Sequence, residues 1–175
     1  AVRRLQDLIR YQAESLLAYA VDIACWDATC NFMASGEPDR AYLESDLPDE
    51  SMGIDFVLFY DAGDRLYHGE VLDGRGTGHL EELKEEVENL LPALREGERN
   101  LSGLLRLDNG VALTAFSPIR NSRSEKEERG TLVLARLIDD FKHFQNSVGG
   151  THGGQRVGGQ CVRSSSFSLP YVVQA

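Results

Sequence analysis

The sequence predicts an α+β domain in which helices cover a five-stranded antiparallel sheet. A long helical pattern fills residues 1–33, and two pairs of short apolar runs are each joined by a turn signal. An amphipathic helical pattern at 80–94 separates the two pairs. Strands joined by local hairpins form antiparallel sheets, and an apolar sheet face needs helices to cover it.

The first helical pattern carries a stripe whose members recur at alternating spacings of four and three. The stripe consists of Leu5, Ile9, Gln12, Leu16, Tyr19, Ile23, Trp26 and Cys30. It fits one long helix or two abutting ones, ended by Ser35-Gly36-Glu37-Pro38. The helix packs either on its own sheet alone or also on a partner helix, and the width of the apolar surface favours a partner. We therefore expect a parallel homodimer through residues 1–30, with Gln12 setting the register.

The remaining elements follow from apolar runs and turn residues. Pro92 is expected to kink or end the second long helix. In chain order we expect helical turns within 39–47, strands at 54–60 and 66–72, a helix at 80–94, strands at 103–107 and 111–119, a charged loop at 121–129, a strand at 130–137 and a short helix at 138–144.

The composition changes near residue 147 and suggests a domain boundary. Gly-Gly recurs at 149–150, 153–154 and 158–159, and three serines follow at 164–166. We expect one folded domain at 1–146 and a flexible Gly/Ser-rich tail at 147–175 that is dispensable for folding. The tail composition equally fits a cloning-derived or read-through extension.

The charge distribution excludes several classes of partner. Lys142, Arg156 and Arg163 are the basic residues of 141–175, which contains no acid, so residues 1–140 carry 15 of the 18 basic side chains and all 28 acidic ones. Such a surface repels nucleic acid and anionic membranes. The chain has no apolar run near the ~20 residues of a membrane span and no secretory signal, and it begins within a helical pattern as an excised piece would. Three cysteines are too few for a disulfide scaffold, and their redox state is left open.

The stretch Asp22–Met33 contains the single tryptophan and resembles a known family. Asp22, then Trp26-Asp27, Thr29 and Phe32 stand at the positions of the fourth class of CHASE domain, an extracytoplasmic sensor module of prokaryotic receptors. Asp46-Leu47 and the turn Asp61-Ala62-Gly63 continue the match, which spans residues 3–140. Asp46 replaces a common Asn, and Cys30 replaces a usual aromatic residue.

The resemblance implies a PAS-like fold close to the single Cache sensors. It places the domain between two membrane helices of a periplasmic or extracellular receptor part that feeds a histidine kinase or diguanylate cyclase. It also implies a ligand-sensing domain that is not an enzyme.

We expect a ligand pocket between the Trp26 face of the first helix and the concave side of the sheet. Trp26 would provide a stacking surface, Asp27 the polar anchor and Thr29 a hydroxyl, and the anionic rim favours a neutral or cationic small molecule. Alternation in the strands gives further lining candidates: Phe56, Leu58, Tyr60, Tyr67, Thr114 and Phe116. Asp22, Asp46 and Gly63 are assigned structural roles. The alternative is plain packing of helix on sheet with buried acids satisfied locally.

Neither a metal site, a cofactor nor a catalytic centre is expected. Asp46, Asp49, Glu50 and Asp55 lie close together but lack the spacing of a calcium loop, so a solvated acidic loop is favoured. The histidines lack ligand spacing, and no nucleophile elbow or phosphate-binding loop is present.

Two other functions remain open. The first is a dimerising interaction module without a small-molecule ligand, which a filled space between helix and sheet would favour. The second is a small acidic hydrolase, which an open groove with two exposed carboxylates would favour.

Overall fold

A computed structural model describes residues 2–48, 50–95, 99–108, 110–121, 124–138 and 172–173. Its helices are α1 (Val2–Ala24), α2 (Asp27–Ala34), α3 (Arg40–Ser45) and α4 (Leu80–Arg95), with short 3₁₀ turns η1 (Glu50–Met52) and η2 (Gly74–Gly76). Its strands are β1 (Phe56–Asp61), β2 (Leu66–Val71), β3 (Leu101–Leu107), β4 (Gly110–Asn121), β5 (Ser124–Leu137) and β6 (Val172–Val173).

The strands form one sheet in the order β2-β1-β5-β4-β3-β6. The first five strands in this order pair antiparallel, whereas β6 adds two residues in parallel to the β3 edge. The predicted α+β class, with its five-stranded antiparallel sheet, long N-terminal helix and helix between the second and third strands, is confirmed.

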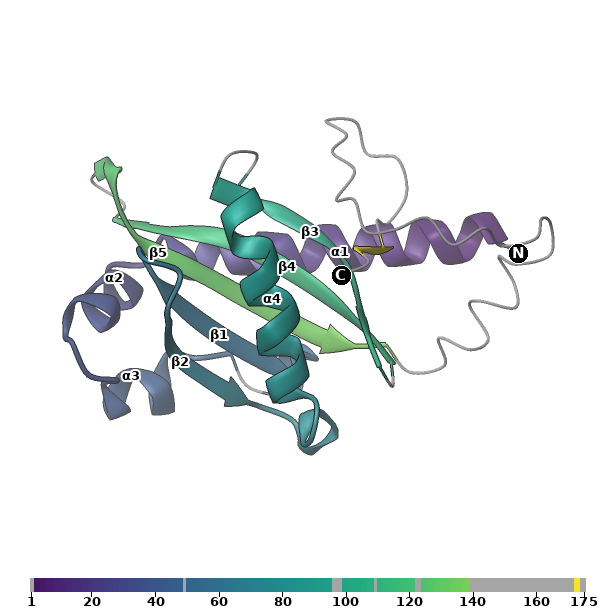
Figure 1. The fold of residues 1–175 in the computed structure, drawn as a ribbon, viewed down its shortest axis with the longest axis horizontal. Helices are drawn as coiled ribbons and strands as arrows, with labels where there is room; N and C mark the ends of the chain where they lie inside the picture. Colours follow the sequence, from purple (N-terminus) through teal and green to yellow (C-terminus); the bar gives the residue numbers. More distant parts are fainter. Residues whose placement is uncertain are drawn as a thin grey trace.

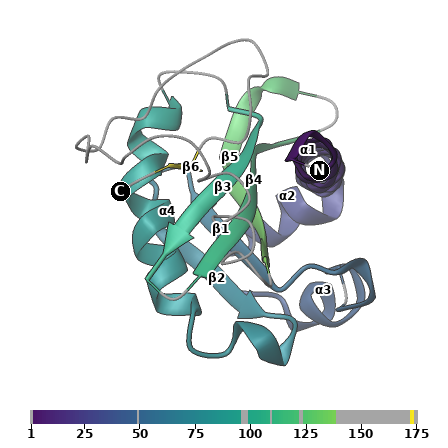
Figure 2. The ribbon, with the colours of Figure 1, turned by 90° about the vertical axis from the view of Figure 1, so that its right-hand side faces the viewer.

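The helices cover both faces of the sheet (Figure 1). Viewed along α1, the sheet separates α4 on one side from α1, α2 and α3 on the other (Figure 2). α1 runs along β4 and also contacts β3 and β5, while α4 packs across the opposite face. Since both faces are covered, β1 is buried from Phe56 to Tyr60 and shows no polar alternation.

Each sheet face therefore has its own hydrophobic core. Ile9, Leu16 and Ile23 of α1 pack on Val57 and Phe59 and their neighbours in one core, which we call the α1 core. The second, the α4 core, lies between α4 and the other face of the sheet. Its main members are Phe56, Leu58, Tyr60, Leu83, Val87, Leu91, Leu105, Phe116 and Val133.

The structure settles three points of the sequence-based expectation. Of the two alternatives for the first helical pattern, the structure has two abutting helices, which meet at Cys25–Trp26, instead of one continuous helix. Pro92 lies inside the last turns of α4 without ending it. The loop expected at 121–129 is mostly strand, because β5 already begins at Ser124 and pairs with the end of β4. The helix expected at 138–144 and the tail at 147–175, apart from β6, lie outside the described residues.

Candidate functional site

The junction between α1 and α2 positions Trp26. The amide of Cys25 bonds the carbonyls of Val21 and Asp22, both at 3.2 Å, and the amide of Trp26 bonds the carbonyl of Ile23 at 3.2 Å. Trp26 then adopts an extended backbone, with φ −69° and ψ 139°, at the N-cap of α2. The change of direction leaves the Trp26 side chain partly in solvent and places Asp27, also exposed, in the first turn of α2, where a carboxylate suits the helix dipole.

Thr29 holds this junction together from inside. Its hydroxyl donates to the Ile23 carbonyl at 2.7 Å and lies 2.8 Å from the Tyr42 hydroxyl. One consistent arrangement has Tyr42 donating to Thr29 while Thr29 donates to Ile23. Burial raises the pKa of Tyr42 to about 12, so its hydroxyl keeps its proton. The hydrogen-bonding capacity of Thr29 is thus spent inside the protein rather than presented to a ligand.

Tyr67 is also engaged in the interior, beside an aromatic cluster. The Phe32 ring stacks on Tyr42 at 4.5 Å between centroids and meets the edges of Phe59 and Tyr67 at 5.0 and 5.2 Å. The Tyr67 hydroxyl donates to the Phe32 carbonyl at 2.9 Å and lies 3.1 Å from the Ser35 hydroxyl. The cluster fixes α2 and α3 to β1 and β2.

The structure divides the predicted ligand-binding residues between the two faces of the sheet. Thr29 and Tyr67 pack with the α1 core, and Trp26 and Asp27 lie at its edge. Phe56 and Tyr60 belong to the α4 core, as do the lining candidates Leu58 and Phe116. Thr114 lies on the same face of the sheet, because it stands two residues from Ala112 and two residues from Phe116 along β4. Its hydroxyl donates to the Gly103 carbonyl at 3.1 Å. These residues do not converge on one pocket, and side chains of the α1 core fill the space between α1 and the sheet.

Tyr60 has an unusual environment within the α4 core. Its side chain is fully buried, and among the described residues its hydroxyl has no hydrogen-bond partner. Burial, and to a lesser extent the charge of Glu88, raises the pKa of Tyr60 well above its ordinary value. A buried hydroxyl without a partner destabilises the fold, because its lost hydration is not compensated by a hydrogen bond.

The three residues assigned structural roles lie at or near the surface. Asp22 is exposed in the last turns of α1, on the same side as Tyr19 by helical spacing. Asp46 ends α3, and its amide bonds the Tyr42 carbonyl at 2.9 Å. The amide of Gly63 donates to Asp61 Oδ1 at 2.7 Å in the β1–β2 turn.

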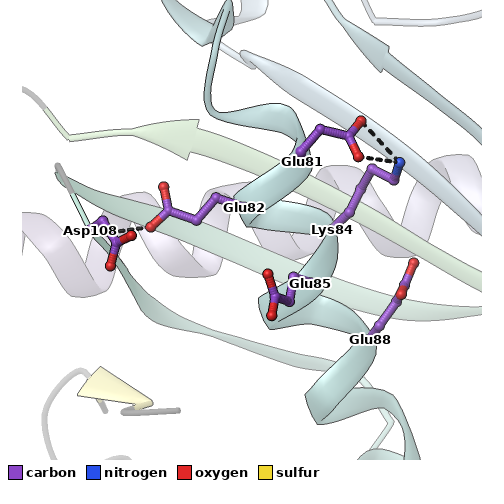
Figure 3. A pocket seen from close by; sticks show the side chains of 6 residues that line it. All are labelled: Glu81, Glu82, Lys84, Glu85, Glu88 and Asp108. Carbon is purple, nitrogen blue, oxygen red and sulfur yellow. Dashed lines mark hydrogen bonds and ion pairs between the residues drawn. The ribbon is translucent and has the colours of Figure 1, made fainter.

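An acidic recess on α4 was not predicted. It encloses about 460 Å³ and is lined by Glu81, Glu82, Lys84, Glu85, Glu88 and Asp108 (Figure 3). Lys84 Nζ is held by Glu81 at 3.0 and 3.1 Å, and Glu82 points to Asp108, whose amide donates to it. The glutamates of α4 suit the positive end of the helix dipole, and their spacing also concentrates charge on one helix surface. In the part of the chain that the structure describes, no group of three or more His, Cys, Asp or Glu side chains is arranged so that it could hold a metal ion.

The outer surface of α1 gathers apolar side chains in solvent. Within the described ranges, the large hydrophobic residues that are exposed are Leu8 at 50%, Tyr11 at 69%, Tyr19 at 40% and Trp26 at 37%, and we call this set the outer stripe. The predicted helical stripe thus separates into a buried part with Ile9, Leu16 and Ile23 and an outward part with Tyr19 and Trp26. None of the helices described combines the length and apolar character that crossing a bilayer demands.

Comparison with known proteins gives one family. The model of the CHASE4 domain matches residues 8–143, which include α1 from its second turn, all of α2, α3 and α4, and strands β1 to β5. No curated protein matches the chain.

Proposed function

Because this chain belongs to the CHASE4 family, the extracellular sensory domains of signalling receptors, we propose that it is a receptor input domain that works as a parallel homodimer joined through α1. A CHASE4 domain senses and does not itself catalyse a reaction. In the proposed arrangement, membrane helices flank the domain in a periplasmic or extracellular receptor part, and a histidine kinase or diguanylate cyclase receives the signal.

The outer stripe is the observation that supports this proposal. Leu8, Tyr11 and Tyr19 expose apolar surface along about three turns of α1, and Trp26 adds to it at the α1–α2 junction, while the other described apolar side chains of this size are at least partly covered. Aromatic residues dominate the energetics of protein interfaces. In a parallel pair each stripe residue would face its own copy, so a tilt of α1 in one protomer would be felt by the other. The isolated domain would pair weakly, since no membrane helices concentrate it.

Disulfide crosslinking tests the pairing and its direction. In a chain with Cys25→Ser and Cys161→Ser, we expect Leu8→Cys and Asp22→Cys each to form a crosslinked dimer under mild oxidation. Glu14→Cys is the matched control, because it is exposed on α1 but lies about 120° from Leu8 around the helix. If the Glu14→Cys control crosslinks as well as the Leu8→Cys and Asp22→Cys variants, the interface is rejected. If only a mixture of the Leu8→Cys and Asp22→Cys proteins crosslinks, the helices pair antiparallel.

A second candidate function is the sensing of a neutral or cationic small molecule at the α1–α2 junction. It is favoured by the partial exposure of Trp26 beside Asp27, which offers an aromatic face and a carboxylate to an amine or a hydroxyl group. The acidic recess on α4 favours the same ligand charge. Because the α1 core is filled, the candidate contacts at the junction reduce to these two residues.

The fluorescence of Trp26, the single tryptophan, tests this second function. A screen of amines, amino acids and sugars should find a compound that changes the emission, and Asp27→Ala should abolish the change in a folded protein. Glu37→Ala, an exposed carboxylate after α2, serves as the control. If Asp27→Ala unfolds the domain, or if Trp26 responds to no compound, the junction only packs and does not bind.

A further inference from the structure

The short turn η2 is joined to α4 by an unbroken run of hydrogen bonds. The amide of Gly76 bonds the Asp73 carbonyl at 2.9 Å, the amide of His79 bonds the Gly76 carbonyl at 3.0 Å, and the amide of Leu83 bonds the His79 carbonyl at 2.9 Å. Asp73 caps the turn by accepting from the Arg75 amide at 3.1 Å. The turn and the first turn of α4 are therefore one connected unit.

Arg75 reaches from η2 to a buried carboxylate at the start of the sheet. Its Nη2 lies 3.0 Å from Asp55 Oδ1, and the Asp55 side chain is only 1% exposed. The other oxygen, Oδ2, accepts from the amide of Leu137 at 2.6 Å, at the last residue of β5. Asp55 thus connects η2 to the end of β5 through its two carboxylate oxygens.

The backbone of Asp55 repeats this connection. Its amide bonds the Ala135 carbonyl of β5 at 2.9 Å, and its carbonyl accepts from the amide of Leu72, just after β2, at 2.8 Å. A buried charge is tolerated only where a partner and hydrogen bonds compensate its lost hydration. Loss of Arg75 would remove the counter-charge of this buried carboxylate.

A steric contact next to the ion pair holds η2 in place. An added Cβ on Gly76 would lie 2.8 Å from two ring atoms of Phe56 and from Val71 Cγ1, so the backbone of the turn lies directly on these side chains. Two consecutive residues of η2, Arg75 and Gly76, therefore contact two consecutive residues at the start of the sheet, Asp55 just before β1 and Phe56 at its first position. The turn has no room to slide along β1.

We propose that η2 is a latch through which the N-terminal end of α4 holds the end of β5. Arg75 is its positioning residue and Asp55 is the shared acceptor. The role of the latch is to regulate the sensor domain proposed above, and this role rests on that proposed function. Because η2 is hydrogen-bonded to the first turn of α4, a displacement of this turn also moves Arg75. Released from Arg75, the Asp55 carboxylate turns toward water and the Leu137 amide loses its acceptor.

Hydrogen exchange at the Leu137 amide, followed by NMR on the full chain, reads the latch directly. We expect Arg75→Gln to speed exchange at Leu137 by about tenfold or more, the scale of one lost charge-assisted link, while the mid-strand amides of Leu132 and Leu134 stay protected. Arg65→Gln is the matched control, because Arg65 pairs with Asp61 at 2.9 Å in an exposed turn. Its substitution should leave Leu137 unchanged.

Further variants separate a latch from general destabilisation. Asp55→Asn keeps the shape of the side chain and removes its charge, and Arg75→Lys keeps the charge but loses the fork that reaches both Asp55 and Asp73. If Arg75→Gln does not fold, the exchange rate of the Leu137 amide in Asp55→Asn and Arg75→Lys tests the latch without it. In the double variant Asp55→Asn/Arg75→Gln, Leu137 should exchange no faster than in the faster single variant.

Two outcomes overturn the proposal. The first is an unchanged rate at Leu137 in every Arg75 and Asp55 variant, and the second is an equal acceleration of all β5 amides, which indicates global opening. The measurement needs neither a ligand nor a dimer, so its failure is distinct from failure of the crosslinking or fluorescence tests.

Discussion

The hydroxyl groups of Thr29 and Tyr42 lie 2.8 Å apart in the core, and the Thr29 hydroxyl is also 2.7 Å from the Ile23 carbonyl. These contacts tie α3 to α2 and to the last turn of α1. Thr29→Val keeps the shape but leaves the Tyr42 hydroxyl without this partner, so we expect a loss of about 1–3 kcal/mol in the free energy of unfolding. Urea denaturation measures it. Combined with Tyr42→Phe, the loss should be clearly less than additive, and simple additivity would show that the two hydroxyl groups do not interact.

The carboxyl of Glu86 makes the stability of the domain depend on pH. Burial, then the charges of Glu85, Glu82 and Asp108, raises the pKa of Glu86 above its ordinary value of 4.5. Folding therefore favours the protonated form, and this contribution is fully present below pH 4.5 and is lost as pH rises through the raised pKa.

Glu86→Gln should accordingly be more stable than the unmodified protein at neutral pH, and the difference should shrink to nothing near pH 4. Thermal unfolding from about pH 4 to 8 measures the difference. Glu44→Gln, an exposed glutamate of α3, should show no such trend. A gap between the Glu86 variant and the unmodified protein that widens toward low pH would contradict the prediction.

Gly130 occupies a position that excludes every side chain. Its φ is +152°, and an added Cβ would overlap the carbonyl oxygen of Tyr60 on the neighbouring strand. Gly130→Ala should cost about 3 kcal/mol or more. Gly110→Ala is the control, since its Cβ would meet nothing within 4 Å and should change stability little. Equal melting temperatures for the two variants would contradict this reading of β1 and β5.

Asp22 weakens the proposed parallel dimer. Its carboxylate lies on the same side of α1 as Tyr19, so two like charges would approach each other across the pair. Asp22→Asn should therefore strengthen self-association, most clearly at low salt, as sedimentation velocity can measure. Glu14→Gln removes a charge elsewhere on α1 and should have little effect. Weaker association of Asp22→Asn would favour an antiparallel pair, in which Asp22 gains attractive partners.

The tail at 147–175 is predicted to be dispensable. Truncation after Asn146 should leave the melting temperature nearly unchanged, because the two residue pairs of β6 with β3, Leu104 with Val172 and Leu105 with Val173, add little to a five-stranded sheet. A second truncation that removes only 171–175 isolates β6. A fall of many degrees in both variants would show that this pairing supports the domain.

The order of elements could be predicted from sequence because each depends on local signals. The hairpin around Asp61-Ala62-Gly63-Asp64 and the amphipathic spacing of α4 are readable without knowledge of the rest of the chain. The break at Trp26 was less readable, because it depends on Thr29 bonding to Ile23 and Tyr42 in the folded core.

The candidate site was harder to predict, because the faces of β1 carry the same kind of side chain. Phe56 and Tyr60 point to α4, while Val57 and Phe59 point to α1. Because apolar residues alternate with other apolar residues along β1, the sequence does not reveal which set faces which helix. The grouping of Phe56 and Tyr60 with Trp26 failed at this step. The acidic recess was missed because one of its six lining residues, Asp108 between β3 and β4, comes next to the α4 residues only in the folded chain.

The hairpin of β1 and β2 carries one extra residue. The pairing runs from Phe59 with His68 directly to Tyr60 with Leu66, so Tyr67 is a bulge, and both Tyr67 and His68 meet the Phe32 ring. The alternation of β2 therefore changes phase at one residue. Relatives that lack the bulge would align with a single-residue gap here, and a length difference of one residue in β2 would mark which family members possess the Tyr67 contact to α2.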